Sequence, residues 1–413
     1  MRILQISTHT TLNPTHGGQI RSNRIAGNLE KNGHVVHRLA VGYRPHDHID
    51  DEREPHIDIA KSSYCRSRMH IRDFGSSWGY FTDYGTMVAA RESPEITKLI
   101  FDQISLAAPD LIMLEHPWLW PILDLYFKAI DRKIPFLYNS QNVEALLKRD
   151  IAINEGLNVD GGIFSSIENL ERECVLNAYA TTTCSESDQK VFIELGGDFV
   201  VNAPNGTDPA LRDHLLNVLP QTIPENASYA LVIGSGHPPN ISGFMNLMSA
   251  VIPNLTCNQR FVIAGGAGDY IFSELEKQGK KEMLRDRCIN LGFVSKPVLD
   301  AVISNANVIA LPIQYGGGSN LKTAEALLSG RRVVGTHHSL RGFPDADCSP
   351  NLRIACDDTF GITVLEELSK PFRINYDGSA THLLWENTTR SIVEVVGTLQ
   401  QRQQEHSYTP TSM

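Results

Sequence analysis

Short apolar segments alternate with segments of helical period along most of this chain. A typical unit is an apolar run, a polar loop, a stretch with apolar residues every three to four positions, and a second apolar run. Such alternation predicts parallel sheets covered by helices on both faces, the doubly wound α/β class. The pattern starts again near residue 230, so we expect two domains of this kind in the 413 residues.

The first half is expected to hold several buried strands and three clear helices. The strands are predicted at 2–7, 34–41, 111–114, 134–138 and 180–184, and the helices at 19–31, 96–107 and 163–178. The second half repeats the pattern, with the glycine-rich stretch 265–268 predicted as a flexible loop. Its strands are predicted at 230–234, 261–264, 307–311 and from 333, and its helices after 240, at 299–304, from 321 and at 389–400.

The most informative stretch runs from Pro312, which stops a strand, through three consecutive glycines to a helix. Ser319 and Asn320 are predicted as N-cap residues of that helix. A glycine loop at a helix N-terminus exposes main-chain N–H groups at the positive end of the helix dipole, which favours an anion. Lys322 adds a charge, and Glu325 can accept from a sugar hydroxyl. The alternative is a strand–helix–strand corner that needs glycines only for its turn.

Composition narrows the function classes. The net charge of −10 argues against general nucleic-acid binding, which needs a basic face. Seven scattered cysteines without a C-x-x-C pair suggest reduced thiols of a cytoplasmic protein. The N-terminus is interpreted as a first strand and not a signal peptide, and no run approaches the ~20 apolar residues that cross a bilayer.

Residues 43–85 break the periodicity, and basic and aromatic side chains interleave over 61–81. This mixture suits peripheral contact with an anionic membrane surface or with a pyrophosphate-linked acceptor. The alternative is an irregular helix pair at the edge of the domain.

The glycine stretch resembles the donor-binding motif of GT-B glycosyltransferases of the GT4 type. The matched variant is P-x-x-x-G-x-G-x-x-x-K-x-x-E-A, and its positions here are Pro312, Gly316, Gly318, Lys322, Glu325 and Ala326. The resemblance implies two Rossmann-like domains that face each other across a cleft, with a C-terminal helix that crosses back to the first domain. We therefore expect domains at 1–203 with 388–402 and at 204–387, and a polar tail at 403–413.

Three departures from the family pattern stand out. The family's first motif glutamate falls on Gly317, whereas Glu325 matches the second, which binds the ribose. The usual arginine and lysine after the first strand of the second domain are replaced by G-x-x-x-P-N-x-x-G, with Asn240 and Gly243. Arg341 replaces the acid of the "g-x-e-G-l" loop.

The resemblance also assigns site residues. Catalytic roles are expected for His116, Lys322 and Glu325, and acceptor contacts for Asn142 and Glu144. Donor contacts are expected for Gly17, Gly18, Arg21, Asn240, Gly292, Val294, Gly316, Gly317, Gly318, Ser319, Asn320 and Leu321. A structural histidine is the alternative for His116, and a solvated surface arginine is the alternative for Arg21.

The function implied is transfer of a sugar from a UDP or GDP sugar to a glycan or lipid-linked acceptor, in surface polysaccharide or glycoconjugate synthesis. Retention of anomeric configuration is implied by the family. No metal or other cofactor is expected, because no Asp-x-Asp motif stands in an expected loop. Two alternatives remain: a nucleotide-sugar epimerase on the same fold, and a non-catalytic nucleotide-sugar-binding module.

Overall fold

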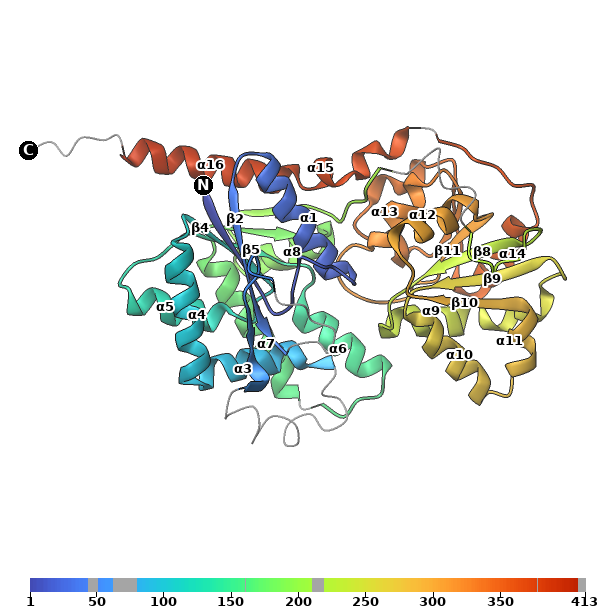
Figure 1. Ribbon diagram of the computed structural model, residues 1–413, viewed down its shortest axis with the longest axis horizontal. Coiled ribbons are helices and arrows are strands. Elements are labelled where there is room, and N and C mark those ends of the chain that lie inside the picture. The colour runs from blue at the N-terminus through green and yellow to red at the C-terminus, as the bar shows by residue number, and fades with distance from the viewer. Residues whose placement is uncertain (44–50, 62–79, 160, 210–218, 377, 408–413) are drawn as a thin grey trace, which may run out of the picture. The chain divides into compact units, whose positions relative to one another are not determined.

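A computed structural model describes residues 1–43, 51–61, 80–159, 161–209, 219–376 and 378–407. The chain divides into two compact units, one of Met1–Pro204 with Thr388–Met413 and one of Asn205–Asn387. Each unit is built on its own parallel sheet with helices on both faces (Figure 1). The expected class, two doubly wound α/β domains, is therefore confirmed.

The described part of the first unit holds a seven-stranded sheet in the order β3-β2-β1-β4-β5-β6-β7. Its strands are β1 (Arg2–Ser7), β2 (Val35–Gly42), β3 (His56–Asp58), β4 (Leu111–Glu115), β5 (Phe136–Asn139), β6 (Ala180–Thr183) and β7 (Val200–Asn202). Its helices are α1 (Gly17–Lys31), η1 (Ile59–Lys61), α3 (Thr82–Glu92), α4 (Pro94–Ala107), α5 (Trp120–Ala129), α6 (Glu144–Asn154), α7 (Gly161–Asn177), α8 (Glu186–Glu194) and α16 (Arg390–Ser407).

The described part of the second unit holds a six-stranded sheet in the order β10-β9-β8-β11-β12-β13. Its strands are β8 (Ser228–Ile233), β9 (Gln259–Ala264), β10 (Cys288–Gly292), β11 (Val308–Leu311), β12 (Arg332–Gly335) and β13 (Leu352–Ile354). Its helices are α9 (Pro238–Leu247), η3 (Ser249–Asn254), α10 (Ala267–Lys277), α11 (Lys281–Arg287), α12 (Lys296–Asn305), α13 (Leu321–Leu328), η4 (His338–Leu340), η5 (Pro344–Cys348), η6 (Asp357–Thr359), α14 (Phe360–Leu368) and η7 (Ser379–Leu383). The short α15 (Trp385–Thr388) follows.

Strand order reverses once in each sheet, between β1 and β4 and between β8 and β11. In open parallel sheets ligands bind beyond the carboxyl ends of the strands at such a switch point. The loops that follow β4 and β11 begin with His116 and Pro312. The topology therefore puts both candidate motifs where a ligand is expected.

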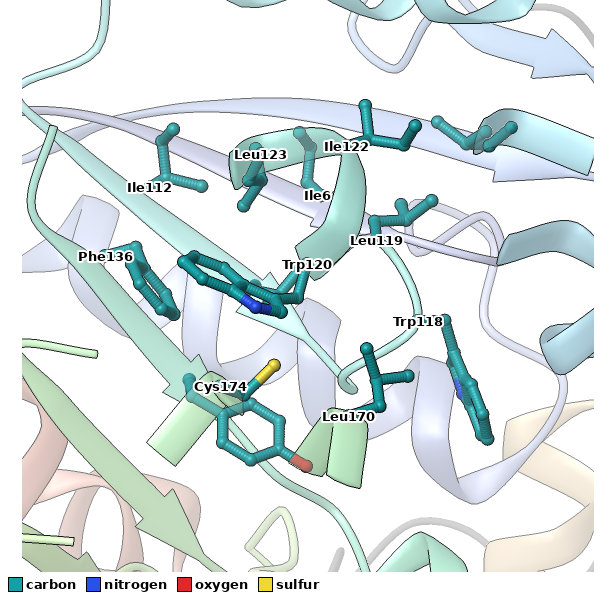
Figure 2. Packing of buried hydrophobic residues seen from close by; sticks show 14 of the residues in the cluster. Ile6, Ile112, Trp118, Leu119, Trp120, Ile122, Leu123, Phe136, Leu170 and Cys174 are labelled. Carbon is teal, nitrogen blue, oxygen red and sulfur yellow. The ribbon is translucent and has the colours of Figure 1, made fainter. Parts of the chain in front are cut away.

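A cluster of aromatic and aliphatic side chains holds the loop after β4 in place (Figure 2). Trp118 is fully buried, and the ring of Trp120 stacks on Phe136 with centroids 4.8 Å apart. Burying two indoles at this point contributes on the order of several kcal/mol. The residues next to His116 are thus fixed by packing.

The last helix belongs to the first unit. Ile392, Val396 and Leu399 of α16 pack in one buried cluster with Ile3 and Ile25. This agrees with the expected return of the C-terminal helix to the first domain.

The helix also extends further than expected. Residues 403–407, predicted as polar tail, continue α16, and Nε2 of Gln403 donates to the main-chain oxygen of Asp110 at 3.4 Å. Residues 408–413 lie outside the described part of the chain.

The structure also corrects the prediction for the glycine-rich stretch 265–268. Gly265 makes a turn at φ 98°, but α10 already begins at Ala267, whose N–H donates to the oxygen of Gly234 at 2.9 Å. The expected flexible loop is therefore shorter than predicted. Of the irregular stretch 43–85, the structure gives β3, η1 and the start of α3, whereas most of 61–81 lies outside the described residues. Over the part of the chain that is described, no helix is long and apolar enough to cross a membrane.

Candidate active site

The backbone conformation of the glycine loop after β11 requires two of its three glycines. Gly316 has φ 130° and Gly318 has φ 62°, values that L side chains rarely adopt. Gly317 lies between them without a positive φ. The turn therefore requires glycine at 316 and 318 but not at 317, the position of the missing family glutamate.

The N-terminus of α13 is left without a side-chain cap, which corrects the expected capping roles. Oγ of Ser319 instead accepts from the N–H of Asn205 at 2.8 Å, and its main-chain oxygen accepts from Asn205 Nδ2 at 2.7 Å. Asn320 occupies the N-cap position with extended backbone, but its side chain makes no capping bond. In the first turn, Thr323 N–H bonds the Asn320 oxygen at 2.9 Å. The N–H groups of Leu321 and Lys322 therefore stay available to a ligand.

Lys322 is held by Asn240. Its Nζ donates to Oδ1 of Asn240 at 2.5 Å, and Nδ2 of Asn240 donates to the main-chain oxygen of Ser235 at 2.9 Å. Burial lowers the pKa of Lys322 to about 8, although the nearby charge of Glu325 opposes the shift. The ammonium is thus poorly solvated and oriented, which suits it to an incoming anion.

Gly243 explains how Asn240 reaches Lys322. A Cβ at Gly243 would lie 1.6 Å from the main-chain oxygen of Pro312. Helix α9 therefore packs directly on the end of β11, and only glycine permits this approach. In the motif G-x-x-x-P-N-x-x-G, Asn240 therefore contacts Lys322, and Gly243 allows the close packing of α9.

Glu325 follows Lys322 by nearly one turn of α13. Burial raises the pKa of Glu325, and Asp300 and Asp208 add to the rise, while Lys296, with Nζ 3.8 Å from Oε1, opposes it. A carboxyl in this setting can accept from, or share a proton with, a sugar hydroxyl.

Gly292 and Val294 lie at the carboxyl end of β10. Gly292 has φ 58°, and its oxygen accepts from the N–H of Gly265 at 2.7 Å. Val294 is half-buried, whereas Phe293 between them is 73% exposed. Both predicted residues therefore share one edge of the second sheet with the glycine loop.

In the first unit, three predicted residues converge. Nδ1 of His116 lies 3.1 Å from Oε1 of Glu144, and Nδ2 of Asn142 donates to the same oxygen at 3.1 Å. His116 has φ 62°, an uncommon conformation for histidine that is often found at functional sites. The side chain of His116 is 12% exposed and that of Glu144 3%. Because Nδ1 faces Glu144, Nε2 is the nitrogen that can meet a ligand.

The surroundings of the His116–Glu144 contact favour the charged form of both side chains. Burial lowers the pKa of His116, but the hydrogen bond and charge of Glu144, with Asp83 and Glu115, outweigh it and raise the pKa overall. Burial raises the pKa of Glu144, but the bond to His116 and the charges of His116 and Lys148 lower it overall. Both shifts favour the charged pair.

Sequence reasoning missed several residues that support this pair. Glu115 is fully buried and accepts from Gln5 Nε2 at 2.7 Å and from Asn139 Nδ2 at 2.9 Å. Glu171 accepts from the N–H groups of Glu144 and Ala145 at 2.7 and 3.0 Å, which fixes the start of α6. The position of Glu115 at the end of a predicted strand could have indicated a functional role. No feature of the sequence around Glu171 in α7 indicates its contact with α6.

His9 and Asp83 also lie near His116. The rings of His9 and His116 have centroids 5.8 Å apart, and Oδ1 of Asp83 accepts from Thr8 Oγ1 at 2.8 Å. Burial, with the charges of His116 and His16, lowers the pKa of His9 to about 3, so its ring is neutral.

Gly17, Gly18 and Arg21 lie in the first turns of α1. A Cβ at Gly18 would lie 2.6 Å from Oε1 of Gln141, so a larger residue there would displace the end of the Gln141 side chain. Arg21 is 1% exposed and donates to the Ala203 oxygen at 2.8 Å and to Asn139 at 3.4 Å. The surface alternative for Arg21 is wrong. Its phosphate contact stays a prediction that this geometry does not favour.

Within the described ranges, no group of three or more His, Cys, Asp or Glu residues is placed to hold a metal ion. None of the six cysteines in the described part forms a disulfide. The predicted membrane or acceptor contact through 61–81 falls mostly on 62–79, which the structure does not describe.

Residues 227–358 match the family described as "Glycosyl transferases group 1". This segment contains β8 to β13, the glycine loop, Lys322 and Glu325. No curated protein matches the sequence.

Solved structures share the fold over nearly the whole chain. Sucrose-phosphate synthase from Thermosynechococcus elongatus has a TM-score of 0.65 at 13% identity, over 99% of this chain and 100% of that one. The catalytic domain of starch synthase IV from Arabidopsis thaliana, bound to ADP and acarbose, has a TM-score of 0.61 at 12% identity, over 97% and 98%. HepE from Anabaena, in complex with UDP and glucose, has a TM-score of 0.56 at 16% identity, over 99% and 100%. The fold is GT-B, and the family match supports a transferase.

Proposed function

We propose that this protein is a retaining, metal-independent glycosyltransferase of the GT4 type. It transfers a sugar from a nucleoside-diphosphate donor to a glycan or lipid-linked acceptor, in the cytoplasm or at the inner face of the membrane. The observation that carries the proposal is the contact of Lys322 with Asn240 beside an uncapped helix N-terminus. This arrangement lies within the segment that matches the glycosyltransferase family.

The second unit binds the donor in this proposal. Main-chain N–H groups of 317–322 and the dipole of α13 take the diphosphate, and Lys322 supplies a full charge. Glu325 accepts from the ribose, and main-chain groups of Gly292 and Val294 frame the base. The bound UDP of HepE and the bound ADP of starch synthase IV support a nucleoside diphosphate as the class of ligand.

The chemistry needs a group that stabilises the departing diphosphate. The bond between the anomeric carbon and the diphosphate oxygen breaks, and a bond from that carbon to the acceptor oxygen forms on the same face. The acceptor proton passes to a leaving-group phosphate oxygen. Negative charge grows on the diphosphate in this step, and preorganised N–H groups with Lys322 stabilise it. No metal is assigned a role, so chelation with EDTA should leave turnover unchanged.

The first unit provides the acceptor side. Nε2 of His116 contacts the transferred sugar or the acceptor, while Glu144 holds the ring through Nδ1. Asn142 and Glu144 contact acceptor hydroxyls. The polar segment 61–81 is assigned to a lipid-linked acceptor or the membrane surface.

A panel of UDP, GDP and ADP sugars, screened by thermal shift, tests the donor assignment, because a ligand that binds only the folded state raises the unfolding midpoint. NMR of the products with and without acceptor then identifies the reaction. A product that requires acceptor and keeps the anomeric configuration supports the proposal. Conversion of donor alone to an epimer supports the epimerase instead.

A non-catalytic binding module is the second candidate. Gly317 in place of a glutamate and the absence of the arginine–lysine pair from the 235–243 loop favour it. Binding of a donor without turnover or hydrolysis of any sugar in the panel would establish the module and exclude the transferase.

A further inference from the structure

A single guanidinium contacts three consecutive carbonyls of the glycine loop. Arg341 donates from Nε to the oxygen of Gly318 and from its two terminal nitrogens to the oxygens of Gly316 and Gly317. Arg341 follows directly after η4, and its side chain is partly buried. The planar fork of arginine suits this task, since its N–H groups point in fixed directions within one plane.

A second residue holds the guanidinium. A terminal nitrogen of Arg341 also contacts Nε2 of His338, one turn earlier in η4. Burial and the charge of Arg341 lower the pKa of His338 to about 4. At neutral pH the ring is therefore uncharged, and Nε2 can accept the hydrogen bond instead of repelling the arginine.

These contacts set the direction of the loop's N–H groups. In a trans peptide the C=O of one residue and the N–H of the next point in opposite directions. Because the carbonyls of Gly316, Gly317 and Gly318 point to Arg341, the N–H groups of Gly317, Gly318 and Ser319 point away from it. The guanidinium thus lies on one side of the loop, and the N–H groups point to the other side.

Two departures from the family pattern meet at this contact. Gly317 occupies the place of a glutamate, and Arg341 occupies the place of an acid. In this chain the two positions are joined by a hydrogen bond from a terminal nitrogen of Arg341 to the oxygen of Gly317. An arginine at 341 thus accompanies the loss of the carboxylate at 317.

We propose that Arg341 is a positioning residue of the diphosphate site: it fixes the peptides of Gly316–Ser319 with their N–H groups toward the phosphates and places a permanent charge behind them. The inference rests on the proposed function, because it specifies which end of a nucleoside-diphosphate donor the loop recognises. Arg341 acts through the main chain of the loop, so its own side chain does not have to contact the ligand.

Calorimetric titration of the full chain with UDP, GDP and ADP, and with uridine, guanosine and adenosine, tests the proposal. In R341Q we expect the affinity for the diphosphate that binds wild type to fall about 10-fold to 100-fold, the range for lost charge-assisted hydrogen bonds. The affinity for the matching nucleoside should not change. R341K, which keeps the charge but not the fork, should recover only part of the loss. A general structural defect would weaken both ligands equally.

R260Q is the matched control, since Arg260 also donates to two main-chain oxygens, those of Cys257 and Gln259, but at the amino end of β9. It should bind as wild type does. Wild-type diphosphate affinity in R341Q, full recovery in R341K, or equal loss of nucleoside and diphosphate would overturn the role of Arg341. If wild type binds none of the three diphosphates, the proposed function fails, and the inference fails with it. If R341Q does not fold, R341K alone decides: selective loss of diphosphate affinity supports the fork, and wild-type affinity overturns it.

Discussion

Nζ of Lys322 donates to Oδ1 of Asn240, so the ammonium is held by a neutral amide and not by a carboxylate. A carboxylate at this place would neutralise the lysine and compete with an anionic ligand. The amide orients the charge without cancelling it, and Ser235 holds the amide in turn. In the proposed function, this relationship allows one lysine to take the role for which the family pattern has an arginine and a lysine.

Removing the ammonium should impair chemistry more than folding. We expect K322A to lower turnover by about 10²–10³, the range for losing one group that stabilises developing charge. The unfolding midpoint of the unliganded variant should not fall, since a poorly solvated charge has been removed. Steady-state kinetics and thermal unfolding measure the two effects. K277A, which alters an exposed lysine paired with Glu274, is the control. Turnover near wild type in K322A would remove the assigned role.

Donor binding should depend on pH through Lys322. The pKa of this lysine is lowered to about 8, mainly by burial, so the ammonium is fully present only below that pH. We expect the affinity for a nucleoside diphosphate to decrease as pH rises through about 8. In N240D the new carboxylate raises the pKa of Lys322, so the decrease should move to higher pH while affinity at pH 7 weakens. Calorimetry between pH 6.5 and 10 measures both curves. A flat profile in wild type would show that Lys322 does not contact the anion.

The His116–Glu144 pair should be visible by NMR. Glu144, together with Asp83 and Glu115, outweighs the effect of burial and raises the pKa of His116 from its usual value. In E144Q the hydrogen bond to the carboxylate and its charge are lost, so the pKa of His116 should fall. The imidazole proton shifts, followed against pH, give both numbers. An unchanged pKa in E144Q would mean that the two side chains do not interact in solution.

The glycine loop offers a matched pair of substitutions. G318A forces alanine to φ 62° and should destabilise the loop by about 1–2 kcal/mol, whereas G317A carries no such conformational cost. We expect donor affinity to fall in G318A more than in G317A. Denaturant unfolding and calorimetry of both variants provide the comparison. Equal effects would indicate that the left-handed conformation at 318 is not needed.

Much of the fold follows from local patterns. Short apolar runs and helical periodicity predicted both sheets. The glycine loop follows β11, one of the strands between which the strand order reverses. Pro312, Gly316 and Gly318 have local reasons for their identity, a strand end and two positive φ angles. Such features can be predicted because neighbouring residues determine them.

The rest depends on partners far apart in the sequence. Serine is a common N-cap residue, but the hydroxyl of Ser319 accepts a hydrogen bond from the N–H of Asn205 instead of capping α13. Arg341 contacts loop carbonyls that lie more than twenty residues earlier in the chain. Glu171 supports Glu144 from another helix. The polar segment at 403–407 stays helical because α16 continues along the first unit. Long-range side-chain contacts of this kind override local propensity.

A crystal structure with a bound nucleoside diphosphate tests the central claim most directly. We expect density for the two phosphates against the N–H groups of residues 317–322, with a phosphate oxygen within hydrogen-bond distance of Lys322 Nζ. A nucleotide bound elsewhere, or phosphates turned away from this loop, would contradict it.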